Sequence, residues 1–466
     1  MDQSMTGVVD KRTPYANDEV AATYRKVSWR LVTFLFVGYL VAYLDRINVG
    51  FAQLQMQHDL GFSDAVYGLG AGIFFAGYFI FEVPSNLMLE KIGVRKTMMR
   101  VLICWGVVSA CMRFISSPIE FYVMRFMLGV FEAGFVPGAI LYLTYWYPET
   151  RRARVLGIFS SAITIAGVIG SPVSGGIMTH LAGVYGMAGW QWLFVLEGIP
   201  AVVLGLLVPY VLVNRPRDAT WLTRREKDIL DHHLATERGL NGADRRHTFG
   251  DALKDPRVYL LAFVYFAIIC GIYAVSFWLP TIIKNTGVKD VFDVGLYSTI
   301  PYGIGALGMI FISRHSDVKM ERRWHLAGCA FIGGASLVMI AATASNLTLA
   351  LVAFAIATAT IFTGMPLFFA LLTSYLSGTA AAGGIALINS LALLGGFVSP
   401  AIMAWAKTTT GSFTSGLYIL AALLVFAGLA VLLCVPAQAL RGTGRRAVGE
   451  MSPDGAVLEQ PVLSDS

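Results

Sequence analysis

The sequence predicts an all-α membrane protein with twelve transmembrane helices, arranged as two pseudo-symmetric halves of six helices each. Three observations carry this prediction: the composition, the number of long apolar stretches, and an internal repeat. Of the 466 residues, 56% are hydrophobic and only 14% are charged, with a mean hydropathy of +0.65. Soluble domains have roughly 25% charged residues, so this composition is typical of a polytopic membrane protein.

Twelve apolar stretches are long enough to cross a bilayer as helices. Their approximate limits are 30–52, 66–88, 97–115, 118–143, 153–180, 190–213, 257–284, 293–315, 324–342, 347–373, 382–407 and 413–436. The polar residues before the first stretch do not form a cleavable signal peptide, because that stretch is too long and too charged for an h-region.

The lysines and arginines indicate how the chain is oriented. They gather in the N-terminal tail, in the loops after the second, fourth and eighth spans, in the middle loop and in the C-terminal tail. The loops after spans 1, 5 and 9 contain none. Because positively charged loops stay in the cytoplasm, we expect a multi-pass protein of the inner or plasma membrane with both termini cytoplasmic. The net charge of +6 then reflects orientation rather than a nucleic-acid partner.

The expected organisation has five segments. They are a cytoplasmic tail at 1–29, a six-helix half at 30–213, a cytoplasmic linker at 214–256, a second six-helix half at 257–436 and a cytoplasmic tail at 437–466. The linker predicts a surface helix over 221–237, and we interpret its mixed charges as a solvated face.

Two pairs of landmarks indicate that the halves repeat each other. Glu90 follows the second span and Asp317 follows the eighth, 227 residues later. Pro172 lies in the fifth span and Pro400 in the eleventh, 228 residues later. Unrelated landmarks therefore give nearly the same offset. Repeated halves with polar residues near the midplane are typical of secondary transporters.

Four charged residues lie within apolar spans of the first half. Arg125 and Glu132 are seven positions apart, which places them on one face of a helix, about 10 Å apart along its axis. Asp45 and Arg46 in the first span point about 100° apart, and we expect each to meet the fourth span. A charge at mid-membrane costs roughly 2.5–3.5 kcal/mol on insertion scales, so these residues predict a polar cavity. The alternative is a set of internal ion pairs that fixes helix register.

The second half lacks matching charges. The repeat offset carries the four charged positions onto Ile272, Tyr273, Val352 and Ala359. Polar but neutral groups such as Tyr273 and Asn389 remain to line the opposite wall. We therefore expect the first half to handle charge and the second half to read the shape of a substrate.

Short charged turns at the cytoplasmic ends predict a conformational latch. The runs E-x-x-G-x-R-K and D-x-x-x-x-R-R place Glu90 with Arg95 and Asp317 with Arg322. A carboxylate at the end of one span can accept hydrogen bonds from a facing arginine and from a helix N-terminus, which would hold the inward side shut. The alternative is ordinary flanking charge of the positive-inside pattern.

The other reactive side chains favour no enzymatic site. Glu82 and Glu197 also lie in spans, and we interpret both as structural. The five cysteines form no C-x-x-C pair and the seven histidines fall in loops or at span ends. This pattern indicates neither a disulfide framework, nor a metal site, nor a nucleophile–base set.

Five runs resemble the anion:cation symporter family of the major facilitator superfamily. They are YLDRINVGFA (43–52), GYFIFEVPSN (77–86), RFMLGVFEAGFVPG (125–138), YLTYWYPETRRAR (142–154) and GTAAAGGIALINSLALLGGF (378–397). The resemblance extends over nearly all of the chain between about 30 and 436. It implies the major facilitator fold and a carrier of organic anions such as sugar acids, tartrate or phthalate.

The resemblance also implies roles for individual residues. Asp45 and Glu132 match the family's proton-carrying acids, and Arg46 and Arg125 match its substrate- and coupling-related arginines. The expected substrate cavity is completed by the polar and aromatic residues Tyr43, Tyr78, Tyr273, Phe369 and Asn389.

Two positions depart from relatives in the family. Phe369 stands where relatives often have Trp, and Thr164 lies near a position that is Gln in some sugar-acid carriers. These changes favour a less hydroxylated or aromatic carboxylate over a polyhydroxy acid.

We therefore expect a secondary active transporter that imports an organic carboxylate by proton symport through alternating access. It would work as a monomer in the lipid bilayer, with the proton as its coupling ion and no other cofactor. The alternatives are an exporter or exchanger on the same fold, sodium in place of protons, and a non-transporting membrane sensor.

Overall fold

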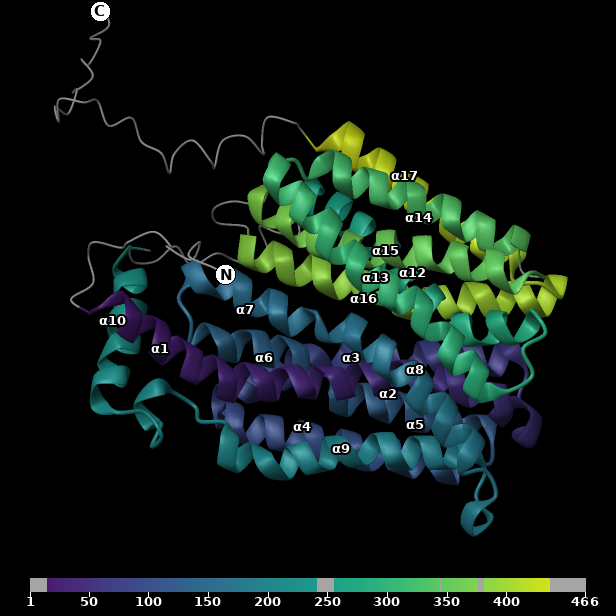
Figure 1. Ribbon diagram of the computed structural model, residues 1–466, viewed down its shortest axis with the longest axis horizontal. Coiled ribbons are helices and arrows are strands. Elements are labelled where there is room, and N and C mark those ends of the chain that lie inside the picture. The colour runs from purple at the N-terminus through teal and green to yellow at the C-terminus, as the bar shows by residue number, and fades with distance from the viewer. Residues whose placement is uncertain (1–14, 241–254, 344, 376–380, 436–466) are drawn as a thin grey trace, which may run out of the picture.

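The computed structural model describes residues 15–240, 255–343, 345–375 and 381–435. Most of the two predicted tails and the end of the linker lie outside these ranges. Within them, twelve helices are long and apolar enough to cross a membrane, which confirms the twelve predicted spans. Figure 1 shows two helical bundles, the N-terminal half in purple to teal and the C-terminal half in green to yellow.

The N-terminal half contains six spans built from more than six helices. Its helices are α1 (Asn17–Val27), α2 (Thr33–Leu60), α3 (Asp64–Ile92), α4 (Val94–Cys111), α5 (Pro118–Glu132), α6 (Phe135–Thr144), α7 (Glu149–Ser160), α8 (Ala162–His180) and α9 (Gly189–Val211). A π-helical turn, Ser28–Val32, joins α1 to α2, so the boundary expected between tail and first half falls inside a continuous helical segment. The fourth span consists of α5 and α6, and the fifth of α7 and α8.

The C-terminal half has one helix for each span. These helices are α12 (Pro256–Asn285), α13 (Val291–Lys319), α14 (Arg323–Thr343), α15 (Leu347–Tyr375), α16 (Ala381–Thr410) and α17 (Thr414–Cys434). The linker contains α10 (Arg224–Leu240), which overlaps the predicted surface helix.

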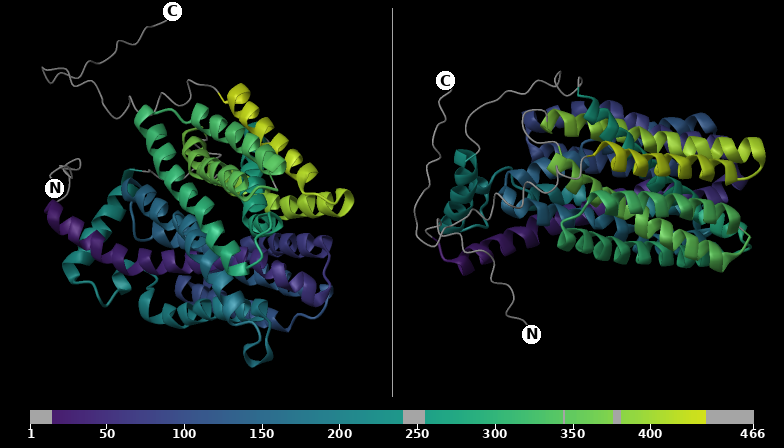
Figure 2. Two further views of the ribbon diagram at one scale, coloured as in Figure 1. Left: turned by 45° about the vertical axis from the view of Figure 1, so that its right-hand side comes forward. Right: turned by 90° about the horizontal axis from the view of Figure 1, so that it is seen from above.

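Helices α1 and α10 project from one end of the bundle, which we call the terminal side; the opposite end is the far side (Figures 1 and 2). The Nζ of Lys26 on α1 lies 2.9 Å from Oε2 of Glu226 on α10. Trp221, just before α10, stacks on Trp146 after α6, with ring centres 5.9 Å apart. The linker helix is therefore anchored on the N-terminal half.

The two halves repeat one pattern of helix packing. Within the halves, α4 packs along α9 as α14 packs along α17, and α3 packs along α5 as α13 packs along α15. Between the halves, α3 packs against α16 and α8 packs against α13. Exchanging the halves converts one of these interfaces into the other, so the predicted pseudo-symmetry is present in the packing.

Helices α2 and α12 lie on the pseudo-two-fold axis. Arg46 hydrogen-bonds Tyr273, 227 residues away, and Thr281 hydrogen-bonds Gln53, 228 residues away. These separations equal the repeat offset, so each residue contacts its own counterpart in the other half. Any motion of one half relative to the other therefore changes the contacts between these two helices.

The two halves approach most closely toward the far side. A Cβ added to Gly295, near the start of α13, would lie 2.4 Å from the carbonyl oxygen of Ser171 on α8. A Cβ on Gly72 of α3 would lie 2.9 Å from the carbonyl oxygen of Phe397 on α16. Small residues at these positions let the backbones touch. The structure is therefore closed at the far side.

Candidate functional site

A break in the fourth span positions its acidic residue. Helix α5 ends at Glu132, Gly134 has a φ of +93°, and α6 begins at Phe135. A Cβ on Gly134 would also lie only 2.3 Å from Oγ of Ser85. Both the positive φ and the lack of room require glycine. The predicted span at 118–143 is therefore present but divided into two helices, and Glu132, which shares α5 with Arg125, is the last residue before the break.

Arg46 and Glu132 form a buried ion pair. The Nε and Nη2 atoms of Arg46 lie 2.6 Å and 2.5 Å from Oε1 of Glu132. Arg46 is 6% exposed and Glu132 is fully buried, and Oε2 of Glu132 has no hydrogen-bond partner among the described residues. As expected, Arg46 meets the fourth span. Removing one member of such a pair typically costs about 3–5 kcal/mol, because it leaves the other charge buried and unpaired.

The same guanidinium reaches the other half. Its Nη1 donates to the hydroxyl of Tyr273 on α12 at 3.2 Å. It also lies over the rings of Tyr78 and Phe74 on α3, 5.1 Å and 5.5 Å from their centres. The faces of aromatic rings attract cations. Arg46 therefore connects α3, α5 and α12, and through α12 the two halves of the protein.

Two further polar contacts cross between the halves. The hydroxyl of Tyr43 lies 3.0 Å from Oγ of Ser276, and Nδ2 of Asn389 donates to Oε1 of Glu82 at 3.4 Å. Glu82, interpreted from the sequence as structural, follows Tyr78 by one helical turn on α3. That spacing was the signal that could have placed it beside the expected substrate positions.

An aromatic wall stands on the C-terminal half. Tyr265 on α12 stacks on Phe368 of α15 with ring centres 4.7 Å apart, and it meets Phe369 edge-on at 5.3 Å. These groups are neutral, whereas Arg46 and Glu132 belong to the other half. We call Arg46, Glu132, Tyr273 and Tyr78 the central cluster.

Arg125 binds a neighbouring helix rather than Glu132. Its Nε donates to the carbonyl oxygen of Gly70 at 3.2 Å and its Nη2 to that of Ala71 at 3.5 Å, both on α3. It is fully buried, and its Nη1 has no hydrogen-bond partner among the described residues. The alternative of an Arg125–Glu132 ion pair is therefore not found in this structure.

Asp45 lies apart from the central cluster. Its carboxylate accepts hydrogen bonds from Nε1 of Trp105 at 2.6 Å, from Oγ of Ser109 at 2.8 Å and from Nδ2 of Asn48 at 3.3 Å. Trp105 and Ser109 belong to α4, the third span, so the expectation that Asp45 meets the fourth span is wrong. Consecutive helical residues point about 100° apart, which turns Asp45 into the interior of its own half while Arg46 faces the other.

One carboxylate–arginine pair of the predicted latch is present. Oδ1 of Asp317 lies 3.6 Å from Nη2 of Arg322, at the terminal end of α13. The side chain of Glu90, the corresponding acid, lies outside the described residues. Both members of the observed pair belong to the C-terminal half, so this contact does not cross between the halves.

Arg95 and Arg323, one from each turn, lie 228 residues apart and occupy equivalent places in the two halves. Nη2 of Arg95 donates to the carbonyl oxygen of Pro209, near the end of α9, at 2.5 Å. Arg323 donates to the carbonyl oxygens of Val431 and Leu432, near the end of α17. Arg323, rather than Arg322, is thus the structural counterpart of Arg95. These arginines satisfy carbonyl groups at helix ends.

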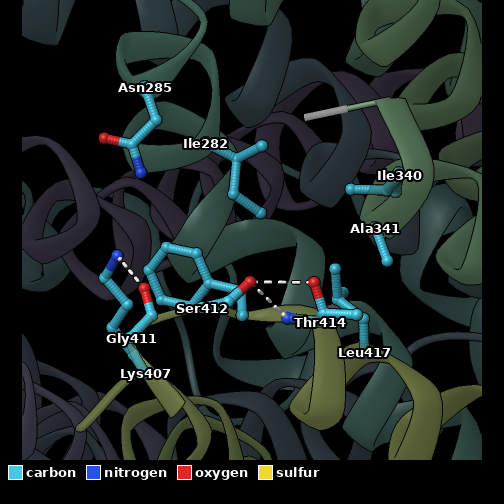
Figure 3. A pocket seen from close by; sticks show the side chains of 10 residues that line it. Ile282, Asn285, Ile340, Ala341, Lys407, Gly411, Ser412, Thr414 and Leu417 are labelled. Carbon is cyan, nitrogen blue, oxygen red and sulfur yellow. Dashed lines mark hydrogen bonds between the residues drawn. The ribbon is translucent and has the colours of Figure 1, made fainter. Parts of the chain in front are cut away.

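A cavity of about 100 Å³ lies elsewhere, at the far side of the C-terminal half (Figure 3). Residues of α12, α14, α16 and α17 line it, including Asn285 and Lys407. The Nζ of Lys407 donates to the carbonyl oxygen of Gly411 at 2.8 Å and lies 5.1 Å from the ring centre of Phe413. None of the residues expected to bind substrate lines this cavity.

Two pseudo-symmetric six-helix bundles, with an ion pair buried where they meet, define the protein as a multi-pass membrane transporter. The chain belongs to the Major Facilitator Superfamily, whose family model matches residues 35–400. It shares 45% identity with the "Putative tartrate transporter" of Agrobacterium vitis, over 90% of this chain and 92% of that protein. It shares 40% identity with the "Quinolone resistance transporter" of Acinetobacter baumannii, over 86% of this chain and 92% of that protein.

The fold also matches a solved transporter. The inward open conformation of the xylose transporter XylE from E. coli aligns with a TM-score of 0.69 at 17% sequence identity, over 88% of this chain and 96% of that chain. The major facilitator fold predicted from the sequence is therefore confirmed, and family and relatives identify a transporter rather than an enzyme.

Proposed function

We propose that the protein imports an organic carboxylate together with a proton, by alternating access between its two halves. The observation that carries this proposal is the position of the Arg46 guanidinium. It is buried on the pseudo-two-fold axis and held between Glu132 of its own half and Tyr273 of the other. No other cofactor is proposed, and the unit of transport is proposed to be the monomer.

The substrate class follows from the chemistry of the central cluster. A guanidinium presents a planar fork of donors that matches the two oxygens of a carboxylate, and it stays charged at any working pH. Tyr43, Tyr78 and Asn389 supply neutral polar groups, and Phe369 belongs to the aromatic wall. The Agrobacterium vitis relative is named "Putative tartrate transporter", which supports an organic acid as the substrate.

Coupling arises because substrate and Glu132 compete for one cation. A substrate carboxylate that binds Arg46 weakens the Arg46–Glu132 ion pair. Glu132 is then a buried carboxylate without a partner, and a proton removes the cost of that charge. Protonated Glu132 in turn releases Arg46 for the substrate. Each ligand thereby favours the binding of the other, as thermodynamic linkage requires.

The cycle uses the closed far side as one of its two end states. The distribution of Lys and Arg supports a cytoplasmic location for the terminal side. The structure then corresponds to a state closed to the outside, and the opposite state requires Gly295 and Gly72 to separate from their neighbours. The Asp317–Arg322 pair, with Arg95 and Glu90 in the other half, is proposed to stabilise the terminal ends of the helices during this exchange.

Uptake into proteoliposomes tests the proposal. Purified protein is reconstituted with an inward proton gradient, and uptake of tartrate and a panel of other organic acids is measured. We expect uptake that a protonophore abolishes. In the variant Glu132→Gln, gradient-driven uptake should be lost, whereas exchange of labelled for unlabelled substrate should persist because Arg46 and the neutral polar groups around it remain. Uptake that survives the protonophore would contradict proton coupling.

Export is the second candidate function, favoured by one relative. The Acinetobacter baumannii protein is named for quinolone resistance, and a transporter confers resistance when it lowers the amount of a compound in the cell. The same central cluster could serve export if the proton gradient drives the cycle in the opposite direction. Membrane vesicles of opposite orientation, each with a defined gradient, distinguish the two directions through the sign of net substrate flux.

A further inference from the structure

The N-terminal half contains a second buried acidic group that the central cluster does not use. Glu197 lies on α9 and is 5% exposed. Its Oε1 accepts a hydrogen bond from Oγ of Ser174 on α8 at 2.7 Å, while its Oε2 has no partner among the described residues. A carboxylate with one bare oxygen in a protein interior is costly when it is ionised.

Asn48 connects this acid to Asp45. Its side chain, 1% exposed, donates to Oδ1 of Asp45 at 3.3 Å and also interacts with the side chain of Glu197. The other atom of its amide, Oδ1, has no partner among the described residues. Two neighbouring buried groups thus each present an acceptor that lacks a donor.

The two carboxylates differ in how many donors they receive. Asp45 accepts from Trp105, Ser109 and Asn48, and hydrogen bonds of this kind stabilise the ionised form of a carboxylate. Glu197 accepts a hydrogen bond from Ser174 at 2.7 Å and interacts with Asn48. A proton on Oε2 would turn the bare acceptor into a donor facing the polar neighbours of Glu197. A proton on Oε2 therefore satisfies the one carboxylate oxygen of this pair that has no partner among the described residues.

We propose that Glu197 is a proton-binding site inside the N-terminal half, with Asp45 as its acidic neighbour. The site is separate from the Arg46–Glu132 pair, so a substrate on Arg46 does not displace its proton. Its contribution to transport, a second proton held away from the substrate, rests on the proton coupling proposed above. Proton binding by Glu197 itself does not depend on that coupling.

The surroundings of Glu197 contain one charged group close to it. Asp45 on α2 is near enough to repel it electrostatically. The helix α8 contributes Ser174, and its titratable residue His180 is at the far end of that helix. The charged residues of α4, which are Arg95, Lys96 and Arg100, lie in its first two turns at the terminal side. Two cations lie on the other elements packed against α9: Arg46 of α2, which is bound to Glu132, and Arg113 of the 3-10 turn Met112–Phe114, which lies over the ring of Phe114.

Infrared difference spectroscopy on the purified full-length protein tests the assignment. Spectra at low and high pH are compared for the wild type, Glu197→Gln, Asp45→Asn and Glu120→Gln, whose exposed carboxylate accepts from Ser116 and is the control. We expect the wild type to show the carbonyl stretching band of a buried carboxylic acid. This component should be lost in Glu197→Gln and retained in Glu120→Gln and Asp45→Asn.

Three results would overturn the proposal: a Glu197→Gln spectrum equal to the wild type, loss of the band in Asp45→Asn, or no such band in the wild type. If Glu197→Gln does not fold, Ser174→Ala provides the second measurement. Loss of the Ser174 hydrogen bond to Oε1 should shift the band and its pH dependence, and an unchanged band would contradict the assignment. The protonophore experiment addresses symport separately, so either idea can fail while the other stands.

Discussion

The two halves of the protein share a pattern of packing but not their chemistry. In the N-terminal half the fourth span breaks after Glu132, and Arg46 occupies the axis. In the C-terminal half the corresponding span is the single helix α15, and Tyr273 occupies the equivalent place on the axis. In the proposed cycle, pseudo-symmetric packing supplies two alternative ways of closing the bundle, whereas coupling needs one cation for which substrate and acid compete. Under that proposal the shared packing serves the motion, and the residues found in one half alone serve the chemistry.

Position on the axis explains why the asymmetry is necessary. Arg46 and Tyr273 are counterparts in the repeat, and they lie within hydrogen-bond distance of each other. A second arginine at position 273 would place two positive charges at that distance in a poorly solvated site, where like charges repel strongly. A tyrosine there accepts from the guanidinium without adding charge. The neutral half can then move relative to Arg46 without carrying a buried charge with it.

Removing the positive charge of Arg46, which distinguishes the two halves, should have the largest effect on transport. In Arg46→Ala, Glu132 loses its partner, and the cost of about 3–5 kcal/mol corresponds to roughly a 1,000-fold loss of uptake. Arg46→Lys keeps the charge but lacks the planar fork and should recover only part of the activity. Initial rates of uptake and of substrate exchange in proteoliposomes measure both.

Lys407→Ala is the matched control for this loss of charge. Lys407 lies at the far side of the C-terminal half, near the end of α16, and its contacts are to Gly411 and Phe413. Its removal should change uptake less than about twofold, as expected for a residue away from the central cluster. Equal losses in the Lys407 and Arg46 variants would mean that Arg46 matters only through general stability.

The sequence predicted the spans well because hydrophobicity and length decide membrane crossing. It also predicted that Arg46 would meet the fourth span. It could not predict the break at Gly134, because one glycine in an apolar run leaves helical periodicity unchanged. The need for glycine at position 134 follows from its positive φ and from the contact with Ser85, and both are known only from the structure.

Predictions failed where the choice of neighbouring helix decided the answer. The angle between Asp45 and Arg46 follows from helix geometry, but the helix that receives each side chain depends on packing between spans. Asp45 accordingly meets Trp105 and Ser109 rather than the fourth span. The hydrogen bond from Asn389 to Glu82 could not be predicted for the same reason, since the two residues lie 307 positions apart. The paired landmarks fixed the repeat only to within one residue, which assigned Arg322 where the structure has Arg323.

A bulky residue at the interface between the halves should disturb the helix packing that the two halves share. In Gly295→Val, side-chain atoms would meet the backbone of α8 at Ser171, which cannot rotate away. Overpacking of this kind costs roughly 1–3 kcal/mol, so the state closed at the far side should become about 30-fold less populated and uptake should fall accordingly. Gly303→Val is the control on the same helix, because a Cβ there meets no atom within 4 Å.

The population shift can be read directly as well as through uptake. Ser298→Cys introduces a thiol on α13 one turn after Gly295, at a position that is fully buried in this structure. A membrane-impermeant thiol reagent should label it faster in the Gly295→Val background than in the Gly303→Val background. Equal labelling in both backgrounds would show that the Gly295–Ser171 contact does not control closure.

The smallest expected effect concerns the hydrogen bond between Arg46 and Tyr273, which joins the two halves at the central cluster. Tyr273→Phe keeps the ring against Phe75 and Phe277 but removes the hydroxyl that accepts from Arg46. At 3.2 Å this bond is long, so we expect the lower end of the roughly 1.5–3 kcal/mol that a hydrogen bond to a charged group contributes, which is about a tenfold change in substrate affinity or uptake. Tyr418→Phe, on the exposed face of α17, should have no effect. If Tyr273→Phe changes exchange and gradient-driven uptake equally, the hydroxyl serves binding alone. A larger loss of driven uptake would mean that this bond carries the state of Arg46 to the half that contributes no charge to the central cluster.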